Sequence, residues 1–361
     1  MPGPADKLSF PPGTELVFGP QATRRQFISD RIAEVSRGWG FTEIILPAFD
    51  SAETFRDLGG ETELYNLVDR EGHRLTLRAD FTLIAAKALA MELRRDARQI
   101  RASYEGRVYR FAPSGHGHRV EQTQRGLEWV NARGATYDAA ALVMARECLD
   151  AAGAENAIIV VGHGGFIHAV LGEKGRVERR LHEALDHKNP SRIAQLAQRI
   201  GIDDDTAALL GSLPLLTGGP EVFKAARGFK LRPEADAALA ELEGLYQLLD
   251  EAGAADRVLI DLGEVRRSDY YSGFMFKVYH EAVGEELGGG GRYDRLFDRF
   301  GMDVPAVGFG FNLARLAEAT SRNGYAGGTA SAVAASEGAK GLKRVLELRA
   351  QGKPVDLKGE A

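Results

Sequence analysis

The stretch "GRVYRFAPSGHGHRVEQTQRGLEWV", residues 106–130, decides the fold. Two β-type runs, 103–111 and 121–130, flank the segment "APSGHGH", whose Pro and Gly residues mark a turn. The stretch therefore predicts an antiparallel hairpin. In its second run, strand alternation puts polar and small residues on one face (Gln122, Gln124, Gly126 and Glu128) and Arg125, Leu127 and Trp129 on the other.

The polar face of this second run has two interpretations. Gly126 lies between Gln124 and Glu128 and leaves a gap where a ligand could lie against the backbone. The alternative is an ordinary solvated face. Polar residues in other predicted strands favour the first interpretation.

The segments around the hairpin predict a sheet with more strands than crossover helices. Helices are expected at 21–38, 83–95 and about 137–152, and strands at 41–50, 73–82, 156–163, 256–264, 265–280 and 304–311. Pro47 closes the first of these strands. We therefore expect an α+β fold, with a mainly antiparallel sheet flanked by helices.

Two regions differ in texture from this core. From about 172 to 255, charged helical segments are interrupted by Pro190, Pro214 and Pro220, which predicts a helical insertion. Residues 323–341 are of low complexity and typical of a linker, and a short helix and strand follow them. The expected division is a main domain at 1–320, insertion included, and a linker with a helix-strand segment at 321–361.

Bulk composition excludes several classes of protein. The formal charge of −5 gives no electrostatic footprint for a nucleic-acid backbone. Cys148 is the only cysteine, so no intrachain disulfide can form. The start "MPGPADKLSFPPG" has no secretion-signal pattern, and no stretch approaches the ~20 apolar residues of a membrane span. We expect a soluble, cytoplasmic protein.

Several predicted strands carry groups that together suit an amino acid. Asp80 and Thr82 share a predicted strand face with Arg78, and Arg110 ends the first hairpin strand. Further candidates lie in "VRRSDYYSGFMFKVYH" (265–280), which contributes Arg266, Tyr270 and Tyr271, and in "GGGGRYD" (288–294), which contributes Arg292 and Tyr293. Carboxylates could hold an ammonium and a ring N–H, and a guanidinium could hold a carboxylate.

Other motifs predict neither a metal nor a cofactor. The glycine run 288–291 lacks the Lys-Ser/Thr of a nucleoside-triphosphate loop. His116 and His118 have no evident third ligand. His163 and His168 are interpreted as turn and core residues, and Cys148 as a packing residue; both lists leave no metal site.

These motifs occur together in a known family. The sequence resembles class II histidyl-tRNA synthetases over nearly all of residues 10–320. The first helix with "GFTEIILPAFD" is similar to their dimer-forming motif 1, 106–129 to motif 2, and "VPAVGFGFNLARL" to motif 3. "VRRSDYYSGFMF" and "GGGGRYDRL" resemble the two histidine-specific signatures. The resemblance implies the class II synthetase-like fold.

The resemblance also implies a set of histidine-binding residues. They are Asp80, Thr82, Arg110, Gln124, Glu128, Arg266, Tyr270, Tyr271 and Tyr293. In the implied roles, Asp80 and Gln124 hold the α-ammonium group and Arg266 the carboxylate. Glu128 or Tyr271 holds the imidazole N–H.

Departures from the synthetase pattern fall on the nucleotide side. Phe111 and Ala112 follow Arg110 where a glutamate is expected, and His118 and Gln122 replace an arginine and an adenine-stacking phenylalanine. Loss of an aromatic stacker alone removes about 1–3 kcal/mol of base binding. Motif 3 keeps Arg315 but has Ala314 where an acid is usual, and only 45 residues follow Leu316, fewer than an anticodon-binding domain needs.

This pattern resembles the synthetase-related regulatory subunits of short-form ATP phosphoribosyltransferase. Members of that family do not aminoacylate tRNA; they activate the short catalytic subunit in a hetero-octamer and make it sensitive to histidine. The resemblance implies a non-catalytic subunit that binds L-histidine, dimerises through the motif 1 region and needs neither nucleic acid nor membrane. Two alternatives stay open: an active histidyl-tRNA synthetase lacking its anticodon-binding domain, or a synthetase-like module sensing another amino acid or tRNA.

Overall fold

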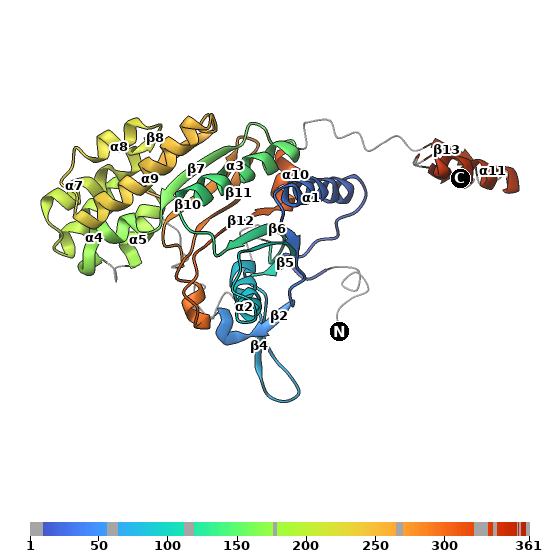
Figure 1. Ribbon diagram of the computed structural model, residues 1–361, viewed down its shortest axis with the longest axis horizontal. Coiled ribbons are helices and arrows are strands. Elements are labelled where there is room, and N and C mark those ends of the chain that lie inside the picture. Colours follow the sequence, from blue (N-terminus) through green and yellow to red (C-terminus); the bar gives the residue numbers. More distant parts are fainter. Residues whose placement is uncertain are drawn as a thin grey trace.

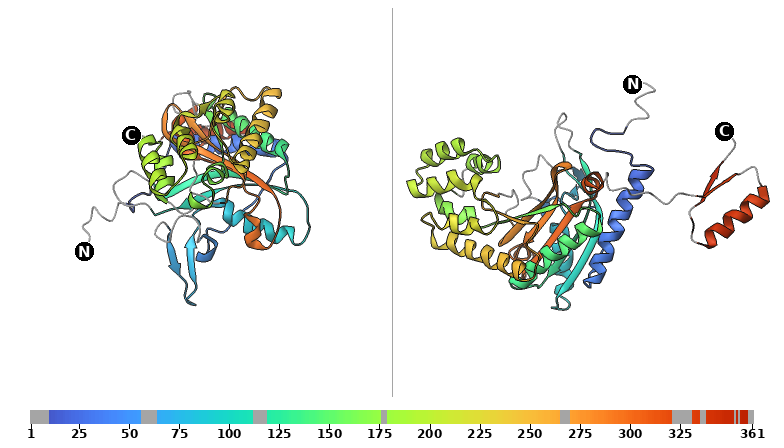
Figure 2. Two further views of the ribbon diagram at one scale, coloured as in Figure 1. Left: turned by 90° about the vertical axis from the view of Figure 1, so that its left-hand side faces the viewer. Right: turned by 90° about the horizontal axis from the view of Figure 1, so that it is seen from above.

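The protein is described by a computed structural model, which covers residues 10–55, 64–111, 119–175, 179–264, 270–320, 331–334, 338–351, 353 and 355–358. Within these residues the fold is α+β, as predicted, with helices on both faces of a large sheet (Figures 1 and 2). No described helix combines the length and the apolar character needed to cross a membrane.

The strands form one large sheet and two small ones. Their bounds are β1 Thr42–Glu43, β2 Phe49–Ser51, β3 Asn66–Val68, β4 Arg74–Leu77, β5 Ile100–Tyr109, β6 Glu121–Val130, β7 Ile158–His163, β8 Thr217–Gly218, β9 Val258–Asp261, β10 Phe274–His280, β11 Val283–Arg292, β12 Ala306–Asn312, β13 Ser331–Ala334 and β14 Val355–Lys358. The large sheet has the order β1-β5-β6-β12-β11-β10-β7-β9-β8. Only β1–β5 and β7–β9 pair in parallel, so the sheet is mainly antiparallel, as predicted.

The helices are grouped by the part of the fold they cover. They are α1 Pro20–Gly38, α2 Phe81–Leu93, α3 Ala135–Ala151, α4 Phe166–Gly175, α5 Arg179–Asp186, α6 Pro190–Arg199, α7 Asp204–Ser212, α8 Glu221–Ala226, α9 Pro233–Glu251, α10 Leu313–Ala319 and α11 Gly338–Ala350, with 3-10 turns at Ala52–Phe55, Leu213–Leu215 and Phe297–Phe300. Helices α5 to α9 gather at one end of the molecule (Figure 1), within the range predicted to be an insertion.

The predicted hairpin is the centre of the sheet. Strands β5 and β6 pair over ten residues, with Tyr104 opposite Gly126 and Ala102 opposite Glu128. On one face, Leu127 and Trp129 pack in a core with α1 and α3. On the other face, Tyr104 and Tyr293 pack in a second core with α2. The alternation predicted for residues 122–129 is therefore confirmed.

Two predicted strands are shorter than expected. Residues 44–48 leave the ladder because the Arg78 guanidinium takes the carbonyls of Leu46 and Pro47, at 3.0 and 2.9 Å. Strand β4 ends at Leu77, and the Asp80 carboxylate accepts a hydrogen bond from the Leu83 N–H at 3.0 Å. That bond is an N-cap and starts α2. The prediction that Arg78, Asp80 and Thr82 share a strand face was wrong.

Buried polar contacts join the insertion to the sheet. Lys188, after α5, pairs with the buried Asp261 at the end of β9. His163, at the end of β7, accepts a hydrogen bond from the Gly165 N–H and contacts Glu241 of α9 at 3.1 Å. His163 is thus a buried turn residue, as interpreted from the sequence.

The C-terminal segment stands apart from the main body in both views (Figures 1 and 2). Strands β13 and β14 pair in parallel and α11 packs against both of them. Ser331–Ala334 lies within the stretch expected to be a linker and forms β13. The division at residue 320 stays a prediction.

Candidate ligand-binding site

Glu128 lies at the centre of the candidate site, on the face of β6 that looks toward α2. Its side chain is buried, and its two carboxylate oxygens accept hydrogen bonds from different tyrosines. The Tyr104 hydroxyl donates to Oε1 at 3.0 Å, and the Tyr293 hydroxyl donates to Oε2. β5 positions the first tyrosine, and the second follows β11 directly.

Burial changes the acidity of this cluster. Desolvation raises the pKa of Glu128 to about 8, while hydrogen bonds from Tyr104 and Thr82 act in the opposite direction. The charge of Asp80 adds to the rise. Burial and the same two carboxyl groups raise the pKa of Tyr104 well above its usual range. The empty site therefore holds a carboxyl group that is poised to exchange a proton near neutral pH.

Asp80, Arg110 and Gln124 border this centre. Asp80 uses Oδ1 to cap α2, and its Oδ2 lies 3.6 Å from the Arg110 guanidinium. Arg110 Nε donates to the Ala79 carbonyl at 2.9 Å, while about half of the side chain stays exposed. The half-buried Gln124 side chain makes no hydrogen bond to the described residues, so its amide can bind a ligand.

Three tyrosines lie together beside Glu128. Tyr270 contacts Tyr271 and Tyr293, with ring centroids 4.7 and 6.0 Å apart. The Tyr271 ring lies over Gly291 of β11, where an added Cβ would approach it to 2.9 Å. These aromatic groups can enclose a flat ligand ring while their hydroxyls supply hydrogen bonds.

Glycines shape the floor of the site. Gly308 of β12 is paired with Glu128, and a Cβ there would overlap Glu128 Oε2 and lie 2.7 Å from the Tyr293 hydroxyl. A Cβ at Gly126 would lie 2.7 Å from the Tyr104 hydroxyl. Both positions need glycine because the hydrogen-bonded cluster lies directly against the backbone.

The structure brings together most of the predicted site residues. Glu128, Tyr293 and Thr82 are linked by hydrogen bonding, Asp80 contacts Arg110, and Tyr270 and Tyr271 complete the ring cluster; Gln124 shares their sheet face. Arg266 lies outside the described residues.

Arg78 and Arg292 have structural partners instead. Arg78 also donates to the Arg107 carbonyl at 3.0 Å and stacks on Phe81. Arg292 pairs with Asp138 and Asp294 and donates to the Ala132 carbonyl. Both were gathered from strand faces, and neither belongs to the set that the resemblance implied.

Sequence reasoning missed Tyr104 and Gly308. The signal for Tyr104 was the hairpin register, which sets this tyrosine opposite the Gly126 gap. The signal for Gly308 was its place in the alternating "VGFGF" strand, where each large side chain faces the core. Pairing with Glu128 depends on the order of strands in the sheet, which a single strand does not reveal.

On the predicted nucleotide side, polar groups are bound to one another. The Asn312 amide donates to Gln122 Oε1 at 3.0 Å, at the place where the resemblance expects an adenine-stacking ring. Arg315 pairs with Glu285 and donates to the Glu286 carbonyl at 2.7 Å. These contacts offer no aromatic surface to a base.

Among the described residues, one cluster has metal-ligand spacing. Asp69, Glu71 and His73 lie at the exposed turn between β3 and β4, with ligand atoms within 4.8 Å of one another. Asp69 already accepts hydrogen bonds from the Glu71 and His73 backbone, which is the ordinary pattern of a carboxylate in a tight turn. The two predicted metal candidates, His116 and His118, lie outside the described residues.

Known proteins match nearly the whole chain. The family model described as "Histidyl-tRNA synthetase" matches residues 13–316. A protein of Moorella thermoacetica called "ATP phosphoribosyltransferase regulatory subunit" is 33% identical, over 98% of this chain and 93% of its own length. The chain belongs to the ATP phosphoribosyltransferase regulatory subunit family. A relative of the same name from Rubrobacter xylanophilus is 32% identical, over 97% of this chain and 85% of that protein.

Solved structures agree with this family. A Bacillus halodurans protein described as "ATP phosphoribosyltransferase regulatory subunit/histidyl-tRNA synthetase" superposes with a TM-score of 0.85 at 27% identity, over 98% of this chain and 93% of that chain. Histidyl-tRNA synthetase from Nostoc sp. PCC 7120 has a TM-score of 0.72 at 21% identity, over 98% and 86%, and supports the fold alone. The predicted synthetase-like fold and the predicted membership in the regulatory-subunit family are confirmed.

Proposed function

We propose that this chain is the non-catalytic regulatory subunit of a short-form ATP phosphoribosyltransferase, in the first step of histidine biosynthesis, and that it senses histidine through the Glu128 site. In this role it activates the catalytic subunit and makes it subject to feedback inhibition by histidine. Family membership supports the regulatory role.

The buried Glu128 carboxyl group, bound by two tyrosine hydroxyls, carries the assignment of histidine as ligand. A ring N–H needs an acceptor in a place without water, and Glu128 offers one beside Tyr271 and Tyr293. The Asp80 carboxylate and the Gln124 amide lie on the same side and suit an α-ammonium group. Together these groups match both ends of an imidazole-bearing amino acid.

The proposal requires histidine to bind one arrangement of the complex more tightly than another, because a ligand without such a preference shifts no equilibrium. Coupling free energies of about 1–3 kcal/mol are usual, which corresponds to a change of roughly 5- to 150-fold in apparent affinity. We further propose that the subunit works in the cytoplasm, in a hetero-octamer, and dimerises through the segment that follows α1.

A direct test uses the purified chain with a short-form catalytic subunit. The two should co-purify, and phosphoribosyl transfer to ATP should rise when this chain is added and fall when histidine follows. Absence of stimulation over a range of subunit ratios would contradict the proposed regulatory role.

The main alternative is an active histidyl-tRNA synthetase. Arg110 and Arg315 are retained, and they are the observation that favours it. Histidine-dependent exchange of pyrophosphate into ATP by the chain alone would establish that activity. Calorimetry against the twenty amino acids separates the remaining alternative, since a sensor of another amino acid would not select histidine.

A further inference from the structure

The outward face of the small sheet β2-β4-β3 is apolar and exposed. Phe49 is paired with Leu77, and Leu67 with Leu75. The Leu77 N–H donates to the Tyr65 carbonyl at 3.0 Å. The Tyr65 ring packs edge-on against Phe111, with centroids 6.1 Å apart. We call these six residues the outer apolar face: Phe49, Tyr65, Leu67, Leu75, Leu77 and Phe111.

The inward face of the same sheet is polar, which reverses the usual arrangement. Thr76 is fully buried, and its strand partner Asp50 is bound by Lys87 of α2 at 2.7 Å. In a sheet with one covered face, apolar residues normally point inward and polar residues outward. Here Phe49, Leu67 and Phe111 stay 53%, 43% and 48% exposed. Contiguous exposed apolar surface marks an interaction site.

The outer apolar face continues into the segment predicted to form a dimer. Between β1 and β2, Ile44 and Leu46 pack on the core, while Ile45 points outward and is 98% exposed. The exposed Pro47 follows, and then Phe49 of the outer apolar face. One apolar surface therefore runs without interruption from the motif 1 segment onto the small sheet.

We propose that a second copy of this chain covers the outer apolar face, so that the small sheet forms part of the dimer interface. The inference rests on the proposed dimerisation through the motif 1 segment and extends it to a surface that the motif does not include. Six side chains cover a few hundred Å², whereas a stable interface needs about 800 Å² per partner. The adjoining Ile45 segment supplies the remainder.

Continuity and composition favour a second copy over another protein. A twofold interface uses the same surface on both subunits, so a single continuous patch is sufficient. Homodimer interfaces are also more apolar than transient ones. The hairpin β3-β4 projects from the body (Figures 1 and 2), which lets it reach across a twofold axis.

This interface would border the ligand site. Phe111 directly follows Arg110, whose guanidinium lies 3.6 Å from Asp80. A partner that covers Phe111 holds the end of β5 in place and with it Arg110. Dimer formation and histidine binding should therefore favour each other, because linkage between two binding events is reciprocal.

The first experiment compares two double variants of the full chain. Phe49→Ser with Leu67→Ser should raise the dimer dissociation constant on the order of a hundredfold, as expected for lost interface anchors, and should weaken histidine binding about tenfold. Leu215→Ser with Leu342→Ser removes equally exposed leucines from elsewhere and should change neither. Sedimentation measures the dimer, calorimetry measures histidine binding, and circular dichroism verifies folding.

A second experiment does not depend on the stability of those variants. Cys148 is buried, so Leu67→Cys adds an accessible thiol to a chain that otherwise has none among its described residues. A short bis-maleimide should link two copies through Leu67→Cys and should not link them through Leu215→Cys.

Each outcome decides the inference. Unchanged dimerisation of the Phe49/Leu67 variant, or no crosslink at position 67, overturns it and leaves the motif 1 dimer standing. A variant that still dimerises but no longer binds the catalytic subunit assigns the face to that protein instead and also overturns it. A wild-type chain that is monomeric at every concentration refutes the proposed dimer, and this inference with it.

Discussion

Glu128 differs from an ordinary surface glutamate in every part of its environment. Water is excluded, each carboxylate oxygen has a tyrosine donor, and Asp80 adds a second negative charge nearby. Burial is the largest cause of its raised pKa of about 8. A carboxyl group kept neutral at pH 7 can receive or give a proton when a ligand binds.

Histidine affinity should therefore depend on pH in a bell-shaped manner. Free imidazole has a pKa of about 6.5, so between about 6.5 and 8 the unbound pair holds one proton, carried by Glu128. Above pH 8 the empty site loses that proton, and below 6.5 free histidine gains a second one. If the complex holds a single proton, affinity falls by up to about tenfold per pH unit on both sides.

Calorimetry of the wild type and of Glu128→Gln, between pH 5.5 and 9, checks this expectation. The variant should bind on the order of a hundredfold more weakly at pH 7, because it removes the charge partner of the imidazole. It should also lack the decline above pH 8. Identical profiles for the two proteins would refute the role given to Glu128.

At the scale of elements, β12 and β6 form the floor of the site through glycines. Gly308 and Gly310 lie on the same face of β12, but only Gly308 is opposite Glu128; Gly310 is paired with Gly126. A Cβ at Gly310 would find its nearest neighbour at 3.6 Å, which is ordinary van der Waals contact. Strand order thus assigns different tolerances to neighbouring glycines.

Gly308→Ala and Gly310→Ala form a matched pair on one strand. The first should push Glu128 out of its hydrogen bonds and lower the free energy of unfolding by about 1–3 kcal/mol, as overpacking does, with loss of histidine binding. The second should leave both properties close to those of the wild type. Urea unfolding and calorimetry measure them, and equal effects of the two substitutions would contradict the close approach at Gly308.

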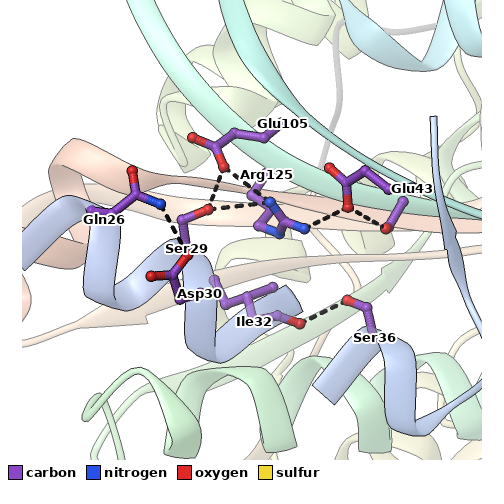
Figure 3. Close-up of polar contacts among 9 residues, drawn as sticks. Gln26, Ser29, Asp30, Ile32, Ser36, Glu43, Glu105 and Arg125 are labelled. Carbon is purple, nitrogen blue, oxygen red and sulfur yellow. Dashed lines mark hydrogen bonds and ion pairs between the residues drawn. The ribbon is translucent and has the colours of Figure 1, made fainter. Parts of the chain in front are cut away.

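The opposite face of β6 is fixed by the buried Arg125. Its guanidinium donates to Glu105 at 2.9 Å, to Glu43 at 2.7 Å and to Ser29 of α1 at 3.2 Å (Figure 3). The strand that carries Glu128 is therefore tied to α1 and to β1, the elements that precede the outer apolar face. Arg125 is 5% exposed, whereas both glutamates reach solvent.

This asymmetry predicts an unusual order of stabilities. Glu43→Ala with Glu105→Ala leaves a buried cation without an acid and should cost about 3 kcal/mol or more, because an uncompensated buried charge is strongly destabilising. Adding Arg125→Met to the same protein should restore most of that loss. Urea unfolding of the double and triple variants measures it; a triple variant less stable than the double would be the contrary result.

The sequence predicted those parts of the site that depend on local periodicity. Alternation along residues 122–129 separated Glu128 from Arg125, and the turn "APSGHGH" set the hairpin. It failed at Asp80, where a capping bond to Leu83 starts a helix inside an apparent strand. Tyr104 and Gly308 were missed because their neighbours come from other strands.

At the scale of the whole molecule, the site lies between two regions that can respond to it. The insertion, α5 to α9, contacts the β7 end of the sheet through His163 and Glu241. The outer apolar face lies beyond Arg110 and Phe111, on the other side. A ligand bound at Glu128 can therefore influence both the insertion and a second copy of the chain.

The central claim is that the synthetase-like pocket, and not the catalytic subunit alone, makes the enzyme complex sensitive to histidine. The decisive measurement is the rate of phosphoribosyl transfer by a complex of the catalytic subunit with Glu128→Gln, titrated with histidine. We predict stimulation equal to that given by the wild-type chain, with the histidine concentration for half-inhibition raised on the order of a hundredfold. Inhibition at the same histidine concentration as with the wild-type chain would contradict the account.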